Sequence, residues 1–124
     1  IGRVQLRHLD EKIARRREIV SIYRKNLAQD CILPENKDGK SVYHQIVIKH
    51  EKRDDIRKEL TESGIGSAIY YETPIHKQPI YQEFKYTLPM SEIFSKKIIS
   101  LPSYPQLTNE QVLEICEHVN KIIG

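Results

Sequence analysis

The sequence predicts an α+β fold, in which a small, mainly antiparallel sheet of three strands carries packed helices and a long helix leads into it. Three observations predict this class. Apolar residues recur at helical spacing near both ends of the chain, residues 42–49 alternate as a half-buried strand does, and each predicted helix has one apolar face that a sheet can cover. With 124 residues, the chain has the size of one domain with its own core. Residues 1–124 are therefore predicted to form a single domain.

The first predicted element is a helix over residues 2–28. Its apolar residues recur at spacings of three, four and seven, which places them in a narrow stripe on one helix face. The stripe consists of Leu6, Leu9, Ile13, Val20, Tyr23 and Leu27. Arg15, Arg16 and Arg17 interrupt it. Because consecutive helical residues point in different directions, we interpret the triplet as a solvated face, with phosphate contact as the alternative.

Residues 42–49 are the first predicted strand, with Val42, His44, Ile46 and Ile48 on one face. His44 therefore shares the more apolar face of this strand. We interpret it as a packed, hydrogen-bonded histidine, and a role in a binding site is the alternative.

The middle of the chain continues with alternating short elements. A helix is predicted over 54–63, and Gly64 fits its C-cap because glycine reaches positive φ without a Cβ clash. Residues 67–71 have the β-branched and aromatic content of a short strand. A helix over 90–97 and a strand over 98–101 complete the predicted sheet region.

The last predicted helix, over 109–123, has the clearest start signal in the chain. Thr108 as N-cap and Gln111 three residues later form a capping box, and Leu107 and Val112 stand at the positions of a hydrophobic staple. These signals fix the start of the helix from local sequence alone.

Composition excludes several classes of function. No apolar run approaches the roughly 20 residues that span a bilayer, so a membrane protein is not predicted. The net charge of +3 comes from basic residues interleaved with acidic ones, which indicates solubility more than nucleic-acid binding. Cys31 and Cys116 lie far apart, with no metal-ligand spacing and no signal peptide. We expect free thiols, no metal and a cytoplasmic location.

A loop rich in polar side chains follows the predicted strand 67–71. Pro74 and Pro79 stiffen it, and binding residues concentrate on such loops. The closely spaced polar residues are Tyr70, Tyr71, Glu72, Thr73, His76, Lys77 and Gln78. From the residues alone, the sequence predicts an α+β domain with a site around residues 70–78.

Five segments extend this prediction through a resemblance. They are IGRVQL at 1–6, YHQIVI at 43–48, GIG at 64–66, PIHKQPIY at 74–81 and LPSYPQLT at 101–108. In order and spacing they resemble the C-terminal part of the DegT/DnrJ/StrS family of nucleotide-sugar aminotransferases, which are fold type I pyridoxal phosphate (PLP) enzymes. The match covers almost the whole chain. Many members of that family have His-Tyr at 70–71 and an aromatic residue at 45, so the departures here concern which sugar is used.

The resemblance implies a homodimeric enzyme that moves an amino group, usually from glutamate, onto a keto group of a nucleotide-linked sugar for cell-surface polysaccharide or related sugars. PLP supplies the electron sink, held as a Schiff base to a lysine. In the family this lysine follows a Ser-Phe pair and precedes a Gly-Glu-Gly-Gly run, in a large domain that also carries the aspartate for the pyridine nitrogen. Phe94 to Lys97 is superficially similar, but no Gly-Glu-Gly-Gly follows.

We therefore assign no catalytic lysine to this chain. Apolar periodicity also starts at the first residue without a capping residue before it, so we expect a fragment that lacks the large domain. Alone, it is expected to bind no PLP and to show no transaminase activity.

The resemblance implies that the segment with Tyr70, Tyr71 and His76 lies at the mouth of the cofactor pocket. It implies that Tyr70, Tyr71 and His76, with His44 as a fourth, bind the substrate. Tyrosine hydroxyls can hydrogen-bond sugar or phosphate oxygens while their rings pack on the sugar. In a regular strand Tyr70 and Tyr71 point to opposite faces, so at most one ring is expected to enter the pocket.

Two other classes stay open at this point. One is a free-standing ferredoxin-like α+β module that binds a ligand or regulates another protein. The other is a nucleic-acid-binding module that uses Arg15 to Arg17, although residues 42–49 lack the basic and aromatic pattern usual for such a strand. If the upstream coding sequence held a Ser-Phe-x-x-x-Lys and Gly-Glu-Gly-Gly block, it would support the aminotransferase interpretation over these two.

Overall fold

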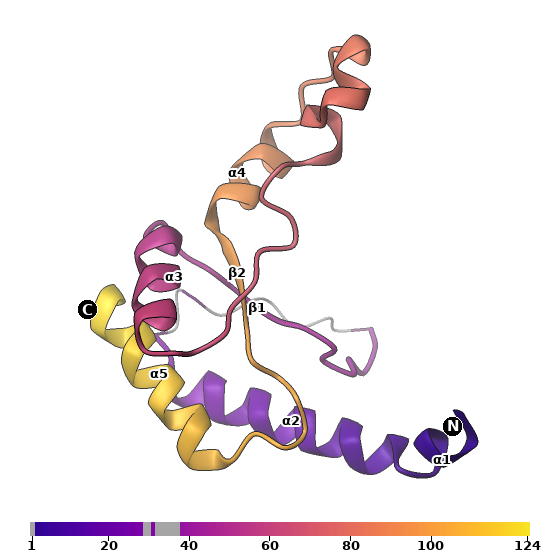
Figure 1. The fold of residues 1–124 in the computed structure, drawn as a ribbon, viewed down its shortest axis with the longest axis vertical. Coiled ribbons are helices and arrows are strands. Elements are labelled where there is room, and N and C mark those ends of the chain that lie inside the picture. Colours follow the sequence, from indigo (N-terminus) through magenta and orange to yellow (C-terminus); the bar gives the residue numbers. More distant parts are fainter. Residues whose placement is uncertain (1, 29–30, 32–37) are drawn as a thin grey trace.

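The computed structural model describes residues 2–28, 31 and 38–124 (Figure 1). The elements in chain order are α1 (Gly2–Arg7), α2 (Leu9–Asn26), β1 (Ile46–Lys49), α3 (Arg53–Glu62), the 3₁₀ turns η2 (Ile75–Lys77) and η3 (Pro79–Phe84), α4 (Pro89–Lys97), β2 (Ile98–Leu101) and α5 (Asn109–Ile123). The predicted α+β class is confirmed. The predicted helices over 54–63, 90–97 and 109–123 correspond to α3, α4 and α5 within one residue at each end.

The core lies where α2, α3 and α5 meet the two strands. In Figure 1, α5 crosses α2 and lies beside α3, and both contacts are extensive. The fully buried side chains include Ile19 and Tyr23 from α2, Ile56 and Leu60 from α3, and Ile99, Val112 and Val119 from β2 and α5. Helices α3 and α5 each bury the apolar face that their sequence spacing predicts.

The start of α5 follows its sequence signals. The backbone N–H of Gln111 donates to Thr108 Oγ1 at 3.2 Å, and the backbone N–H of Thr108 donates to Gln111 Oε1 at 3.0 Å. This is the predicted capping box. Gly64 has φ of 73° after α3, and the N–H of Ile65 donates to Leu60 O at 2.8 Å, so the predicted glycine C-cap is also present.

The N-terminal region differs from the predicted single helix over 2–28. His8, with φ of −106° and ψ of 11°, separates α1 from α2. Helix α1 buries no residue, and Leu6 and Leu9 of the predicted stripe are exposed. Ile19, which lies outside that stripe, is fully buried. The reason is that α2 packs on α5 through its C-terminal half. This contact determines which face of α2 is buried, and the longest apolar repeat does not.

β1 and β2 form an antiparallel pair, with Ile46 opposite Leu101 and Ile48 opposite Ile99. The predicted third strand is reduced to one bridge, between Ala68 and Ser100. The described residues therefore hold a two-stranded sheet and not the three-stranded sheet that the sequence predicts.

The edge of β2 explains why the third strand stops at one bridge. A longer antiparallel strand would next use the backbone of Ile98 and Pro102. The Ile98 carbonyl accepts a hydrogen bond from Arg53 Nη1 at 3.2 Å, and the Pro102 carbonyl accepts one from Tyr23 Oη at 3.1 Å. Proline also lacks the N–H that the ladder needs. Two side chains from the helices thus hold the carbonyls that a third strand would use.

The first strand is also shorter than the predicted 42–49. It begins at Ile46, and His44 is exposed instead of packed on the apolar face. Tyr43 has φ of 46°, a left-handed conformation that interrupts the alternation of a strand. The expected burial of His44 is therefore wrong.

Residues 70–97, which we name the arm, extend away from the sheet in Figure 1. They contain η2, η3 and α4. Of the α4 residues only Ser95 is buried, so the predicted packing of this helix on the sheet is wrong. The reason is that Arg53 binds the carbonyls of Ser95 and Ile98, at the C-terminal end of α4. From there the rest of the helix extends away from the body, by which we mean the described residues outside the arm. Among the described residues, no helix is long and apolar enough to cross a membrane.

Candidate functional site

The predicted site residues lie where the chain leaves the sheet for the arm. Tyr70 follows the Ala68 bridge by two residues, and its side chain is 46% exposed. Tyr71 is 70% exposed, and the two rings meet edge to face with centroids 5.6 Å apart. Neither tyrosine is a core residue, so both rings are available to a ligand.

Tyr70 and His44 line one cavity of about 330 Å³, which we name the sheet cleft. Its other lining residues are Gln45, Gly66, Ser67, Ala68, Ser100, Leu101, Pro102 and Ser103. The Ala68–Ser100 bridge brings Tyr70 to one side of β2. His44 lies on the other side, where its carbonyl accepts a hydrogen bond from Ser103 Oγ at 3.2 Å. Two residues far apart in the sequence are thereby placed in one cleft.

The polar groups of the sheet cleft are hydroxyls, an amide and an imidazole. Hydroxyl and amide side chains both donate and accept hydrogen bonds, which suits a ligand with many hydroxyl groups. The tyrosine ring offers an apolar face beside its hydroxyl. This set can bind and orient a sugar-like ligand.

Tyr71 and His76 line a second and larger cavity of about 850 Å³ within the arm, which we name the arm cavity. Most of its other lining side chains are apolar or aromatic, among them Ile80, Phe84, Tyr86 and Phe94. The four residues predicted from the sequence thus divide between two cavities. These meet at the Tyr70–Tyr71 ring pair, because each ring lines one of them.

His76 is held by α4. Its Nε2 lies 3.0 Å from Glu92 Oε1, and Lys77 Nζ lies 3.3 Å from the same oxygen. The His76 hydrogen bond, with a smaller contribution from Lys77, holds the pKa of Glu92 below its usual range against the opposing effect of burial. His76 therefore joins η2 to α4 while it faces the arm cavity.

The sequence analysis missed Ser100, Ser103 and Glu92. Ser103 lies in the segment 101–108 that carries the resemblance, so a signal for it existed. Ser100 is the only polar residue of β2, so the sequence also held a signal for Ser100 as a site residue. Glu92 had no local signal, because its role depends on how the arm folds back to bring α4 beside η2.

The residues that line the two cavities, all within the described part of the chain, include neither a lysine nor a carboxylate. Lys96 is exposed on α4, and Lys97 forms an ion pair with Glu51. In the described residues, no group of three or more His, Cys, Asp or Glu side chains could hold a metal ion. The side chains that line the two cavities are suited to binding and orienting a ligand.

Residues 1–120 match the DegT/DnrJ/EryC1/StrS aminotransferase family. Among curated proteins, the chain is 35% identical over 128 residues to a GDP-perosamine synthase from Escherichia coli O157:H7, covering 98% of this chain and 34% of that protein. It is 34% identical over 121 residues to a dTDP-3-amino-3,6-dideoxy-alpha-D-galactopyranose transaminase from Aneurinibacillus thermoaerophilus, covering 95% of this chain and 33% of that protein.

The fold agrees with a solved structure of the same kind. The crystal structure of S. venezuelae DesV in complex with a ketimine intermediate superposes with a TM-score of 0.90 at 30% identity, over 96% of this chain and 34% of that one. The chain therefore spans about a third of the length of the proteins that it matches.

Proposed function

Since this chain belongs to the DegT/DnrJ/EryC1/StrS aminotransferase family, we propose that it is the small C-terminal domain of a PLP-dependent enzyme that transfers an amino group onto a nucleotide-linked keto sugar. We propose glutamate as the amino donor, cell-surface polysaccharide or related sugars as the destination, and a cytoplasmic homodimer as the working form. The nucleotide-sugar names of the relatives support the substrate class. The large domain is proposed to come from the remainder of a longer polypeptide.

The cofactor cannot be held by the two cavities of this chain. PLP needs a lysine for its Schiff base and gains from a carboxylate beside its pyridine nitrogen, and the described lining residues provide neither. The chain's residues thus do not fit the cofactor by themselves. We propose that the large domain anchors PLP, which supplies an electron sink when bound, and that this chain contributes the substrate side of the active site.

Within that enzyme, the sheet cleft is proposed to bind the sugar. Tyr70 and His44 both line the cleft, and they belong to segments that pair with opposite edges of β2, so together they can fix the orientation of a sugar ring. Tyr71 and His76 are proposed to bind the adjoining part of the substrate from the arm cavity. The observation that carries this proposal is the convergence of Tyr70 and His44, from segments far apart in the sequence, in one cleft lined by hydroxyl groups.

Single-turnover kinetics on the intact enzyme test this assignment. Tyr70→Phe removes one hydroxyl and leaves the ring, so kcat/KM of the sugar half-reaction is expected to fall at least about tenfold, roughly 1.4 kcal/mol, the scale of a lost hydrogen bond. His44→Gln, Tyr71→Phe and His76→Ala are measured beside it. The glutamate half-reaction should change less, because the sugar is absent from it.

Two controls separate binding from scaffold effects. Tyr104→Phe alters another exposed tyrosine outside both cavities and should behave as wild type. Glu92→Gln removes the partner of His76, so equal losses in Glu92→Gln and His76→Ala would assign His76 to holding the arm. Wild-type rates in both half-reactions for Tyr70→Phe and His44→Gln would refute the sheet cleft as the sugar site.

A further inference from the structure

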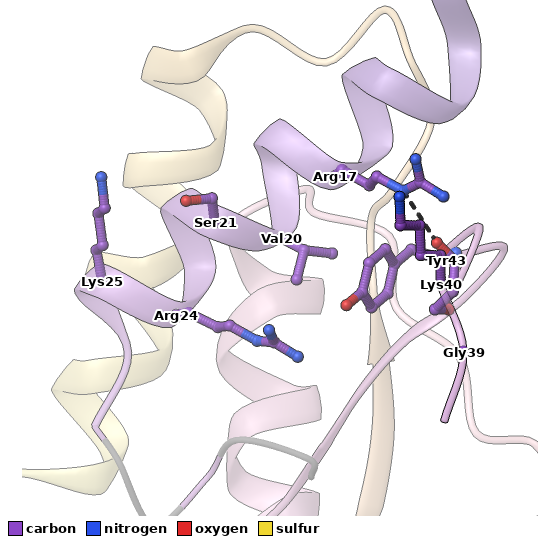
Figure 2. A pocket seen from close by; sticks show the side chains of 9 residues that line it. Arg17, Val20, Ser21, Arg24, Lys25, Gly39, Lys40 and Tyr43 are labelled. Carbon is purple, nitrogen blue, oxygen red and sulfur yellow. Dashed lines mark hydrogen bonds between the residues drawn. The ribbon is translucent and has the colours of Figure 1, made fainter. Parts of the chain in front are cut away.

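Two of the cavities outside the sheet cleft differ in how their polar groups are used. One, of about 680 Å³, lies between α2 and residues 39–43, and Figure 2 shows Arg17 and Lys40 on its walls. Arg17 Nε donates to the Ser41 carbonyl at 3.2 Å, drawn there as a dashed line, and Ser41 Oγ accepts the backbone N–H of Tyr43 at 3.1 Å. Polar groups of this cavity thus hold the segment 39–43 against α2.

The arm cavity, in contrast, is lined by a histidine with one ring nitrogen that has no partner. His76 is only 9% exposed, and its Nε2 lies 3.0 Å from Glu92 Oε1. The other ring nitrogen, Nδ1, has no hydrogen-bond partner in the described part of the chain, yet protein atoms do not enclose it. The cavity that His76 lines is the space open to Nδ1. An unpaired polar atom on a buried side chain calls for a partner from that space.

Glu92 receives three donors at a single carboxylate oxygen. Besides His76 Nε2, Lys77 Nζ lies 3.3 Å from Glu92 Oε1, and the backbone N–H of Leu88 donates to it at 3.4 Å. Glu92 also stands in the first turn of α4, where the helix dipole favours a negative charge. The His76 hydrogen bond, and then the Lys77 contact, keep the pKa of this carboxyl below its usual range. At neutral pH the group is therefore ionised and can only accept hydrogen bonds.

This acceptor decides which nitrogen of His76 carries a proton. A carboxylate can bond to an imidazole nitrogen only through an N–H, so Nε2 is the protonated nitrogen. In a neutral imidazole the second nitrogen then carries a lone pair and accepts hydrogen bonds. In His76 that nitrogen is Nδ1, which opens on the arm cavity.

We propose that Glu92 is a positioning residue, which holds His76 with its proton on Nε2 so that Nδ1 accepts a hydrogen bond from the substrate in the arm cavity. Ile80, Phe84 and Phe94 line the same cavity, so the matching part of the substrate is an apolar group that carries an O–H or N–H donor. The contact discriminates against a group without that donor, because the buried acceptor then stays unpaired. The contact with the substrate rests on the proposed function, whereas the proton position on His76 does not.

NMR of the intact polypeptide, labelled with ¹⁵N at histidine, tests the proton position. The His76 signals are those that are missing from the spectrum of His76→Gln. At neutral pH the wild type is expected to show Nε2 protonated and Nδ1 unprotonated. Glu92→Gln should give a measurable mixture of both tautomers, because a glutamine amide donates as well as accepts. Glu83→Gln, which changes an exposed carboxylate of the arm outside the cavity, is the matched control and should leave the His76 signals unchanged.

Phenol and anisole test Nδ1 as an acceptor, because both carry an apolar ring and only phenol carries an O–H donor. At millimolar concentration phenol is expected to shift the Nδ1 signal of His76, and anisole to shift it much less. Phenol should bind at least about threefold more weakly to Glu92→Gln, since only one of the two tautomers accepts at Nδ1. The wild-type spectrum and the phenol titration need no substitution, so they decide the proposal even where a variant does not fold.

Several results would overturn the proposal. A proton on Nδ1 in the wild type, an unchanged His76 spectrum in Glu92→Gln, or equal effects of phenol and anisole would each do so. In the sugar half-reaction, Glu92→Gln should lose less than His76→Ala, because glutamine still accepts from Nε2 through its amide oxygen. Equal losses would overturn the positioning role, and wild-type rates in both variants would overturn the contact with the substrate. The sheet cleft is decided separately, by Tyr70→Phe and His44→Gln.

Discussion

At the scale of single residues, Tyr23 shows how one side chain joins the core to the candidate site. It is buried on α2, and its hydroxyl donates to the Pro102 carbonyl at 3.1 Å. Pro102 lines the sheet cleft. Tyr23→Phe should lower the free energy of unfolding by about 1 kcal/mol, because the carbonyl loses its donor while the ring still fills the core. Urea denaturation measures the change, and Tyr104→Phe on the surface should stay within about 0.5 kcal/mol of wild type.

The same substitution has a signature at high pH. Burial raises the pKa of Tyr23 far above its usual value near 10. The unfolded chain therefore ionises this hydroxyl at a pH where the folded chain keeps it neutral, so stability is complete below the usual pKa and falls as pH rises above it. Tyr23→Phe should reduce that alkaline loss. An unchanged alkaline dependence together with unchanged stability would contradict both expectations.

At the scale of elements, Glu59 fastens α3 to α5. Lys121 Nζ lies 2.8 Å and His118 Nδ1 lies 2.9 Å from Glu59 Oε1. The hydrogen bond from Lys121, followed by that from His118, holds the pKa of Glu59 below its usual range, although burial acts in the opposite direction.

Acid should therefore weaken this contact between helices. Because the folded pKa is depressed, the contribution is present above the usual glutamate pKa and is lost as pH falls through the lower, folded value. Glu59→Gln should make stability less dependent on pH in that acidic range, and Lys121→Met should do the same by removing the partner. Urea midpoints measured across the acidic range test this, with Lys96→Met on α4 as the control. A slope in Glu59→Gln equal to that of wild type would rule out the contact as a source of acid sensitivity.

At the scale of the whole molecule, the body and the arm differ in what holds them. The body has a continuous apolar core, whereas α4 buries only Ser95. Arg53, a buried residue at the start of α3, donates from Nη1 to the carbonyls of Ser95 at 3.1 Å and Ile98 at 3.2 Å. One side chain of the body therefore holds the base of the arm.

Arg53→Met should loosen the arm more than the body. The two carbonyls lose a charged donor, which costs on the order of 1–3 kcal/mol. Hydrogen exchange followed by mass spectrometry should show faster exchange in α4 and β2, with a smaller change in α5. Arg57→Met is the matched control on the same helix, because its pair with Glu72 is on the surface, at 3.8 Å, and such pairs contribute little. Equal acceleration in α4 and α5 would show global destabilisation instead of release of the arm.

The candidate site was predictable in part. Tyr70, Tyr71 and His76 stood out because prolines and polar residues gather around them in the sequence, and each lines a cavity. The division of that group between two cavities was not predictable. It follows from the end of strand pairing at Ala68, which depends on Arg53 and Tyr23, residues that no local pattern connects to the loop.

The sequence by itself determined the α+β class, the helices α3 and α5 and the family, because caps, periodicity and the order of five segments are local properties. Thr108 starts one helix and Gly64 ends another, and both signals involve only neighbouring residues. Tertiary structure alone decided that the third strand would shrink to one bridge, that His44 would lie exposed in the sheet cleft and that Arg17 would meet Lys40 across a pocket. These features depend on contacts between residues that lie far apart in the chain. Such contacts form only once the helices have packed, and they then compete for the same backbone groups and surfaces.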